Sequence, residues 1–375
     1  MKHVNLLIKP SSSLCNMRCA YCFYTDESER RTQKSMGLMS WETADQLIEA
    51  AFSAVERLGS VSFSFQGGEP TLAGLDFFRH FTEKVRWRNR DHLSVAYAIQ
   101  TNGLCLTEEW ADFFRENRFL VGISVDGDRA IHDRFRKDAE GHDTFERVSA
   151  HVEMLLKNRV DTNILCVVNG QTAEKPRRVY RALKSLNTGY LQFIPCLDPL
   201  GSPRGSMPWS LSAEAYGRFL CGVFDEWYTD WRQGRYVSVR QFDDWVHVAM
   251  GLPPGMCATC GQCGGYLVAE ADGSLYPCDF YALDEWKLGT VRDGLENVFR
   301  SEKMAAFCRR STVKPPDCAA CTFKRLCRGG CPRDWEERDG KTINTLCPAL
   351  RTMFSRNRGR ILEIAREEII AGWQV

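Results

Sequence analysis

Three cysteines near the start of the chain have the spacing of a metal-binding loop. Cys15, Cys19 and Cys22 form a CxxxCxxC pattern. Three thiolates from one short loop can bind a single centre and leave a coordination position free, whereas a structural zinc ion is usually enclosed by four ligands. Because cysteine thiolates are the standard ligands of iron–sulfur clusters, we predict a cluster with one iron atom that no side chain binds. Buried or incidental thiols are the alternative interpretation.

Eight further cysteines form a second group late in the chain. They are Cys257, Cys263, Cys278, Cys318, Cys321, Cys327, Cys331 and Cys347. Eight thiolates are the right number for two closed four-cysteine clusters, but they could also form two zinc sites of four cysteines each, and spacing alone leaves both open. Cys260 lies between Cys257 and Cys263 and could replace either of them. The remaining cysteines are interpreted as buried free thiols: Cys105, Cys166, Cys196, Cys221 and Cys308.

The composition agrees with metal or redox chemistry. The chain has 375 residues, of which 17 are cysteines, and a formal net charge of +1 that gives no reason to expect a nucleic-acid partner. No apolar run approaches the roughly 20 residues that a membrane-spanning helix needs, and the first residues are too short an apolar stretch for a signal peptide. We therefore expect a cytoplasmic protein without a membrane partner. In that reducing compartment, many cysteines indicate metal ligation or redox chemistry.

The elements that must position these residues alternate between strand and helix patterns. Strands are expected at 4–9, 61–65, 94–99, 119–124, 162–168 and 190–194. Helices are expected at 41–58, 75–87, 108–116, 145–157, 174–186 and 213–231. Regular alternation predicts a parallel sheet with right-handed crossovers. Six units are fewer than the eight of a closed barrel, so a partial barrel and a doubly wound sheet both fit.

Either architecture places chemistry in the loops that follow the strands. The first cysteine loop follows the first expected strand, and conspicuous segments follow later ones at 66–70, 100–103, 126–127 and 195–199. The pattern changes near residue 235, because residues 257–347 are rich in Cys, Gly and Pro and a last helix is expected at 349–370. We therefore divide the chain into residues 1–235 and 236–375.

Two motifs together resemble the radical S-adenosylmethionine (SAM) superfamily. The cysteine loop ends in an aromatic pair, Phe23-Tyr24, and Gly67-Gly68-Glu69-Pro70 follows the second expected strand. The resemblance implies a partial (β/α)6 barrel and a [4Fe–4S] cluster whose free iron is chelated by the amino and carboxylate groups of SAM. One electron then cleaves SAM, and the resulting 5′-deoxyadenosyl radical abstracts a hydrogen atom. The SAM contacts that it implies are Tyr21, Gly68, Ser124, Arg136 and Leu197.

The late cysteine region resembles the SPASM extension of peptide-modifying radical SAM enzymes. That extension binds two auxiliary [4Fe–4S] clusters, so the resemblance implies three clusters in all. One auxiliary cluster would be bound by Cys257, Cys263, Cys278 and Cys331. The other would be bound by Cys318, Cys321, Cys327 and Cys347.

Four segments spread over the chain resemble the anaerobic sulfatase-maturating enzymes more specifically. These segments are 6–10, 65–74, 192–200 and 276–281. The resemblance implies oxidation of one Cys or Ser in a sulfatase Cys/Ser-x-Pro/Ala-x-Arg segment to Cα-formylglycine. It also implies Asp279 as the catalytic base, an electron acceptor at the Cys278 cluster, and Tyr24 and Gln66 as contacts of the substrate peptide. The implied partners are an unfolded or nascent sulfatase segment and a flavodoxin or ferredoxin-type reductant.

Two other functions remain open at this point. One is a different SPASM maturase that forms thioether or carbon–carbon cross-links in ribosomal peptides. Such enzymes often carry a leader-binding domain at the N-terminus, and here the expected barrel starts within the first ten residues. The other is an electron carrier or a zinc-stabilised interaction protein, which would need neither the Gly-Gly-Glu-Pro segment nor an open three-cysteine loop. The sequence leaves the choice between Cys and Ser substrates and the oligomeric state undecided.

Overall fold

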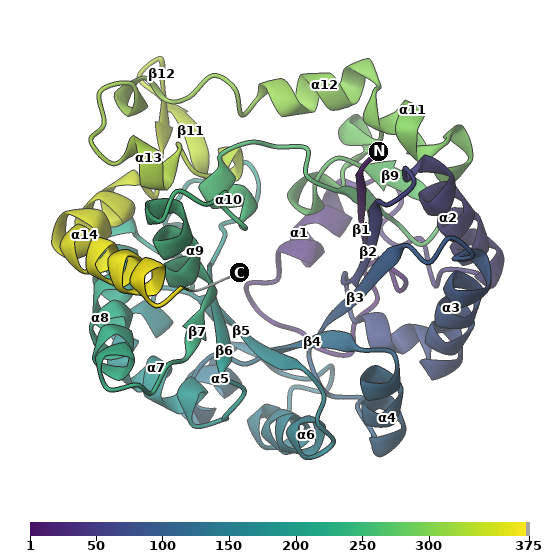
Figure 1. Ribbon diagram of the computed structural model, residues 1–375, viewed down its shortest axis with the longest axis horizontal. Coiled ribbons are helices and arrows are strands. Elements are labelled where there is room, and N and C mark those ends of the chain that lie inside the picture. The colour runs from purple at the N-terminus through teal and green to yellow at the C-terminus, as the bar shows by residue number, and fades with distance from the viewer. Residues whose placement is uncertain (373–375) are drawn as a thin grey trace.

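The computed structural model describes residues 1–372, and one curved sheet positions the site (Figure 1). Its ten strands run in the order β10-β9-β8-β1-β2-β3-β4-β5-β6-β7. The central six strands are parallel neighbours in chain order. This order confirms the partial barrel, because a doubly wound sheet would reverse its strand order at one point. They are β1 (His3–Ile8), β2 (Ser60–Phe65), β3 (Ser94–Thr101), β4 (Phe119–Ser124), β5 (Thr162–Val168) and β6 (Tyr190–Pro195).

Helices cover the outer face of this sheet (Figure 1). They are α2 (Trp41–Ala54), α3 (Leu75–Arg88), α4 (Glu108–Glu116), α6 (Phe145–Lys157), α7 (Pro176–Lys184) and α8 (Ala213–Arg232). The outward residues of each strand are apolar and belong to the core, as at Val61, Phe63 and Phe65. The alternating inward residues are small or polar, as at Ser62 and Ser64. The inside of the barrel is therefore suited to a polar site and not to a packed core.

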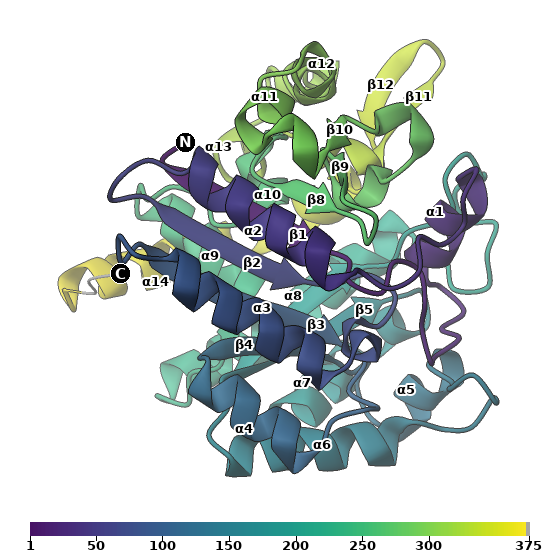
Figure 2. The same ribbon diagram turned by 90° about the vertical axis from the view of Figure 1, so that its right-hand side faces the viewer.

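The late part of the chain extends the same sheet at both edges. After α8, the short β7 (Ser238–Val239) pairs with β6, and α9 (Arg240–Ala249) and α10 (Cys257–Cys260) follow. The chain then crosses to the other edge, where β8 (Leu267–Ala269) pairs in parallel with β1. β9 (Ser274–Tyr276) and β10 (Gly289–Thr290) continue that edge, beside α2 and α11 (Leu295–Phe299) (Figure 2).

The remaining elements enclose the cysteine-rich part. They are α12 (Glu302–Arg309), α13 (Lys324–Cys327), β11 (Trp335–Arg338), β12 (Lys341–Asn344) and the long α14 (Cys347–Ile370). α14 packs against α8 and α9, so the C-terminal helix lies on the barrel (Figure 1). No helix among residues 1–372 has the length and apolar character needed to cross a membrane. The division between residues 235 and 236 remains a prediction.

The structure differs from the expected elements mainly at short helices. α1 (Phe23–Arg30) and α5 (Arg129–Phe135) were not expected, since neither has the apolar period of a longer helix. The helix expected at 41–58 ends at Ala54, because Val55 is extended and Leu58 is exposed with a positive φ. Two further short helices, α11 and α12, lie in the cysteine-rich part, for which no helix before residue 349 was expected.

Candidate active site

The first cysteine loop lies between β1 and α1 and is held by backbone hydrogen bonds. The N–H groups of Arg18 and Ala20 donate to the carbonyls of Lys137 and Phe135 at 2.8 and 3.1 Å. Burial raises the pKa of the Cys15 thiol to about 11 and that of Cys19 to about 12. The three expected thiols of this loop are close enough to affect one another electrostatically, so the structure brings them together.

The Gly-Gly-Glu-Pro segment supports this loop from the end of β2. The N–H groups of Gly68 and Glu69 donate to the carbonyls of Ser12 and Leu14 at 2.8 and 2.7 Å. A Cβ atom on Gly68 would lie 2.0 Å from the Leu14 carbonyl oxygen, so this close approach of two backbones requires glycine. Glu69 is buried, and its carboxylate accepts hydrogen bonds from Thr71, Thr101 and Asn102. The segment therefore fixes the loop to the ends of β2 and β3.

A buried ion pair adjoins the thiol of Cys19. Arg136 donates from Nε to Asp126 Oδ2 at 2.9 Å and from Nη2 to Oδ1 at 3.2 Å. The hydroxyl of Tyr21 also donates to Asp126, and Arg136 Nη1 lies 4.0 Å from Cys19 Sγ. We call Tyr21, Asp126 and Arg136 the Arg136 cluster. Asp126 was singled out in the sequence only as a residue that follows a strand, and its pairing with Arg136 was missed.

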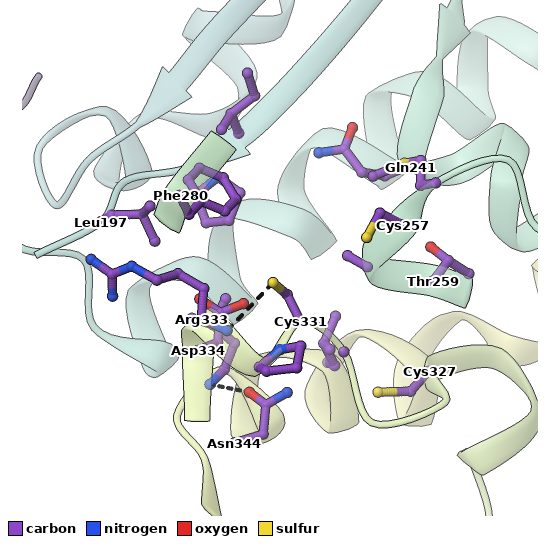
Figure 3. Close-up of a pocket in the computed structure, with 18 of the residues that line it drawn as sticks. Leu197, Gln241, Cys257, Thr259, Phe280, Cys327, Cys331, Arg333, Asp334 and Asn344 are labelled. Atoms are coloured by element: carbon purple, nitrogen blue, oxygen red, sulfur yellow. Dashed lines mark hydrogen bonds between the residues drawn. The ribbon is translucent and has the colours of Figure 1, made fainter. Parts of the chain in front are cut away.

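The other expected SAM contacts lie at strand ends around the barrel. Ser124 is the last residue of β4, on the inward face opposite the core residues Val121 and Ile123. Leu197 follows β6 and lines the cavity that also contains Cys257 and Cys331 (Figure 3). Ser124 and Leu197 thus lie at the ends of two different strands.

Asp279, Tyr24 and Gln66, which the resemblance singled out separately, meet at one point. Asp279 opens the short 3-10 helix η3 (Asp279–Tyr281) directly after Cys278 and is 5% exposed. Its Oδ2 accepts hydrogen bonds from the Tyr24 hydroxyl at 2.7 Å and from Gln66 Nε2 at 3.0 Å. Its Oδ1 accepts no hydrogen bond. Burial and the Asp279 charge raise the pKa of Tyr24, so its hydroxyl keeps its proton and remains a donor.

A buried lysine beside Asp279 was not expected from the sequence. Lys9 follows β1 and is 1% exposed, and its Nζ lies 3.2 Å from Asp279 Oδ1 and 3.3 Å from Glu27 Oε2. Glu270 lies 4.0 Å from the same ammonium and pairs with Arg31. We call these five residues the Lys9 cluster. A charged residue at the end of an apolar strand was the signal that could have identified it, because such a charge needs buried partners.

Neighbouring strand ends bring the Lys9 cluster together. Lys9 N donates to the carbonyl of Ala269 at 2.8 Å on the β8 side, and Gln66 N donates to the carbonyl of Ile8 at 2.9 Å on the β2 side. Glu270 and Gln66 therefore flank Lys9 along one edge of the sheet. α1 supplies Tyr24 and, one turn later, Glu27.

The later cysteines gather around two cavities. The thiols of Cys257, Cys278 and Cys331 affect one another electrostatically and line a cavity of about 330 Å³, with Cys263 beside them. Cys257 in α10 and Cys331 before β11 reach this cavity from separate segments (Figure 3). A second cavity of about 460 Å³ is lined by Cys318, Cys321, Cys327 and Cys347, together with Cys260, and Cys327 lines the first cavity as well.

The structure also separates Cys260 from Cys263. Cys263 lines the first of the two cavities, whereas Cys260 lines the second. Cys166 and Cys221 are buried free thiols, as predicted, but Cys196 and Cys308 are only partly buried and Cys105 is exposed, so the prediction was wrong for these three. Cys105 lies in the loop after β3 and accepts a hydrogen bond from Asn16 at 2.9 Å.

The donor sets fit iron–sulfur clusters. Each of the three groups consists of cysteine thiols, which are the ligands such clusters use. Among the described residues, no three or more His, Cys, Asp or Glu side chains lie at the spacing of a single metal ion. A cluster distributes its protein ligands over separate iron atoms, and the two late cavities provide room between the thiols.

Comparisons with known proteins agree with this geometry. Residues 10–183 match the model of the radical SAM superfamily, and residues 254–322 match the SPASM iron–sulfur cluster-binding domain. A cysteine-type anaerobic sulfatase-maturating enzyme of Clostridium novyi is 41% identical, over 98% of both chains. A serine-type enzyme of Bacteroides thetaiotaomicron is 32% identical, over 92% of this chain and 87% of the relative.

A solved structure extends the likeness to three dimensions. The structure described as "Native anSMEcpe with bound AdoMet and Cp18Cys peptide" is 39% identical, covers 97% of this chain and 99% of its own, and superposes with a TM-score of 0.92. The protein is therefore a radical SAM enzyme that uses SAM and [4Fe–4S] clusters. Sequence and structure together show that the chain belongs to the family of anaerobic sulfatase-maturating enzymes.

Proposed function

We propose that the enzyme oxidises one Cys or Ser of a sulfatase Cys/Ser-x-Pro/Ala-x-Arg segment to Cα-formylglycine. The observation that carries this proposal is the meeting of Asp279, Tyr24 and Gln66 beside the first cysteine loop. When bound, the clusters and SAM supply the 5′-deoxyadenosyl radical and an acceptor for the second electron. The chain's own residues must then hold the peptide and remove a proton.

Asp279 is our candidate for the group that takes this proton. Oxidation at Cβ requires the loss of a proton as well as of a hydrogen atom, and a carboxylate within the site can accept it. Tyr24 and Gln66 bind Oδ2 and fix the orientation of the carboxylate, while Oδ1 is buried and lies 3.2 Å from the Lys9 ammonium. Tyr24 and Gln66 remain our candidates for holding the peptide backbone.

The ligands of the three clusters follow from the thiol groups. We propose Cys15, Cys19 and Cys22 for the cluster that binds SAM. The first late cavity supports Cys257, Cys263, Cys278 and Cys331 as one auxiliary set, and the second supports Cys318, Cys321, Cys327 and Cys347 as the other. Because Cys278 precedes Asp279, an electron acceptor would lie next to the base.

SAM contacts are proposed at the residues around the first loop. Tyr21 and Arg136 adjoin Cys19, and a guanidinium can bind the SAM carboxylate. Gly68 touches the loop itself, and its backbone is suited to the SAM amino group. Ser124 and Leu197 complete the set from the ends of β4 and β6.

The partners follow from the same proposal. The substrate is an unfolded or nascent sulfatase segment, and a flavodoxin or ferredoxin-type protein supplies electrons. A reducing compartment such as the cytoplasm suits a chain with 17 cysteines. The identity of 41% with a cysteine-type enzyme, against 32% with a serine-type enzyme, makes a Cys peptide the first substrate to test.

The test is an anaerobic incubation of cluster-loaded enzyme with SAM, a reductant and two peptides that differ only by Cys or Ser at the target position. Mass spectrometry of the peptide and quantification of 5′-deoxyadenosine are the readouts. Conversion of the side chain to an aldehyde supports the proposal and identifies the preferred residue. Cleavage of SAM with both peptides unchanged would favour a different SPASM peptide modification. No SAM cleavage by protein that holds iron and sulfide would contradict the radical reaction itself.

A further inference from the structure

The charges of the Lys9 cluster do not balance. Lys9 and Arg31 contribute two cations, whereas Glu27, Glu270 and Asp279 contribute three carboxylates, and all five residues are buried. Burying a charge is costly unless it is paired. When all five groups are ionised, the cluster carries one excess negative charge, and uptake of one proton neutralises it.

Lys9 bridges the proposed base to a second buried carboxylate. Its ammonium donates to Glu27 Oε2 at 3.3 Å and contacts Asp279 Oδ1 at 3.2 Å. Glu27 is 3% exposed, and its other oxygen accepts a hydrogen bond from the Ala282 N–H at 3.1 Å. Asp279, Lys9 and Glu27 therefore form a continuous row of proton-carrying groups.

We propose that Lys9 and Glu27 form a buried proton relay behind Asp279, with Glu27 as the carboxylate that holds the substrate proton after oxidation. This inference rests on the proposed role of Asp279 as the base. Lys9 gives one ammonium proton to Glu27 and receives the substrate proton from Asp279. Lys9 ends as an ammonium again, Asp279 as a carboxylate and Glu27 as a carboxylic acid. One proton moves and no electrons do.

The properties of Glu27 suit this task. Burial raises its pKa to about 7, against the opposing charge of Lys9. Burial lowers the pKa of Lys9, but three carboxylates raise it further, so Lys9 remains a cation between transfers. Glu270 is held by Arg31 and is a poorer place for the proton. The charged and titratable groups around Glu27 are Lys9 after β1, Asp279 in η3, and Tyr24 and Arg31 from α1 and its end.

The relay predicts a pH dependence with a defined sign. Glu27 accepts a proton only when it is ionised, so formation of the aldehyde should fall as the pH drops through about 7. Hydrogen abstraction precedes this step and should be less affected. The ratio of aldehyde to 5′-deoxyadenosine, measured in wild-type enzyme from about pH 6 to about pH 8.5, is the direct readout. A ratio that stays constant over this range would overturn the relay.

A pair of variants on the same helix completes the test. Glu27→Gln keeps the size of the side chain and removes the acceptor, whereas Glu29→Gln removes an exposed carboxylate two positions further along α1. With Glu27→Gln we expect roughly tenfold lower aldehyde formation, an unchanged KM for the peptide and loss of the acidic limb. Deuterium from a Cβ-labelled peptide should still appear in 5′-deoxyadenosine. Glu29→Gln should behave as wild type.

The outcome also separates the relay from the base. If Glu27→Gln keeps the wild-type rate and pH profile while Asp279→Asn is inactive, the relay is wrong and the base remains. If Asp279→Asn is fully active, the proposed base is wrong and the relay falls with it. Iron content and urea unfolding of each variant show whether it is folded; should Glu27→Gln fail this check, the wild-type ratio decides alone.

Discussion

Two buried polar clusters lie beside the first cysteine loop, and their charges differ. The Arg136 cluster has one cation and one carboxylate, joined by two hydrogen bonds. The Lys9 cluster has two cations and three carboxylates. A balanced pair has no electrostatic reason to change its protonation and is suited to holding a ligand. The unbalanced cluster gains from taking up a proton, so we propose binding for the first cluster and proton transfer for the second.

Cys15→Ala should have the largest effect, because the proposed roles of the Arg136 cluster and the Lys9 cluster both depend on the iron–sulfur cluster that the first cysteine loop would hold. We expect SAM cleavage to be abolished, since three thiolates are the minimum that the proposed cluster uses. The measurement is 5′-deoxyadenosine produced per enzyme under reducing conditions. Cys105→Ala, which removes an exposed thiol next to Asn16, is the matched control. A Cys15→Ala enzyme that still makes 5′-deoxyadenosine would refute the proposed role of the loop.

Asp279→Asn tests the unbalanced cluster. The change keeps the shape of the side chain but removes the proton acceptor, so aldehyde formation should fall by about 10² to 10⁴. The iron–sulfur clusters should remain, because no cysteine is altered. Peptide oxidation by mass spectrometry and iron content together check this. Asp272→Asn, which alters an acid in the turn between β8 and β9, is the control, and wild-type turnover in Asp279→Asn would contradict the assignment.

Arg136→Lys tests the balanced cluster. Lysine keeps the charge but cannot form the two-point contact with Asp126, so the cation should move away from Cys19. We expect the KM for SAM to rise about tenfold, with an unchanged pH dependence of the aldehyde ratio. Arg134→Lys, an exposed neighbour on α5, is the comparison. A shifted pH profile in Arg136→Lys would remove the functional distinction between the two clusters.

Removal of iron with a chelator should leave most of the secondary structure of the barrel unchanged. The barrel has a continuous apolar core, whereas the thiols of the late region surround cavities. We therefore expect chelation to change the helical circular-dichroism signal little and to open residues 254–347 to protease first. Limited proteolysis with mass spectrometry of the fragments locates the cuts. Early cleavage within the barrel strands would contradict this expectation.

The barrel could be predicted from the sequence because its elements repeat. Each strand and helix carries its own apolar period, and alternation alone implies a parallel sheet. The late region has few periodic segments, so the sequence identified its cysteines but not the return of β8 to β1. That pairing joins residues more than 250 positions apart, and no local pattern in three-residue strands encodes it.

The sequence singled out only some of the residues of the candidate site. Asp279, Tyr24 and Gln66 were identified by resemblance, and the structure brings them into contact. Lys9 was missed although its charge at the end of an apolar strand was a signal, and Glu27 was missed because it lies within a polar run. Only burial makes them significant, and burial depends on how β1, α1 and η3 pack. That Cys260 lines the second cavity could likewise not be read from its spacing.

The pairing of β8 with β1 has a consequence for engineering. A fragment that ends near residue 235 would lose β8, and the edge of β1 would then offer unpaired backbone groups to other molecules. Such a fragment should aggregate, however complete its first cysteine loop. A chimaera that exchanges the cysteine-rich part with that of a relative would therefore have to bring a strand that matches Leu6, Leu7 and Ile8 in register. Such an exchange should therefore include both β8 and the matching strand β1.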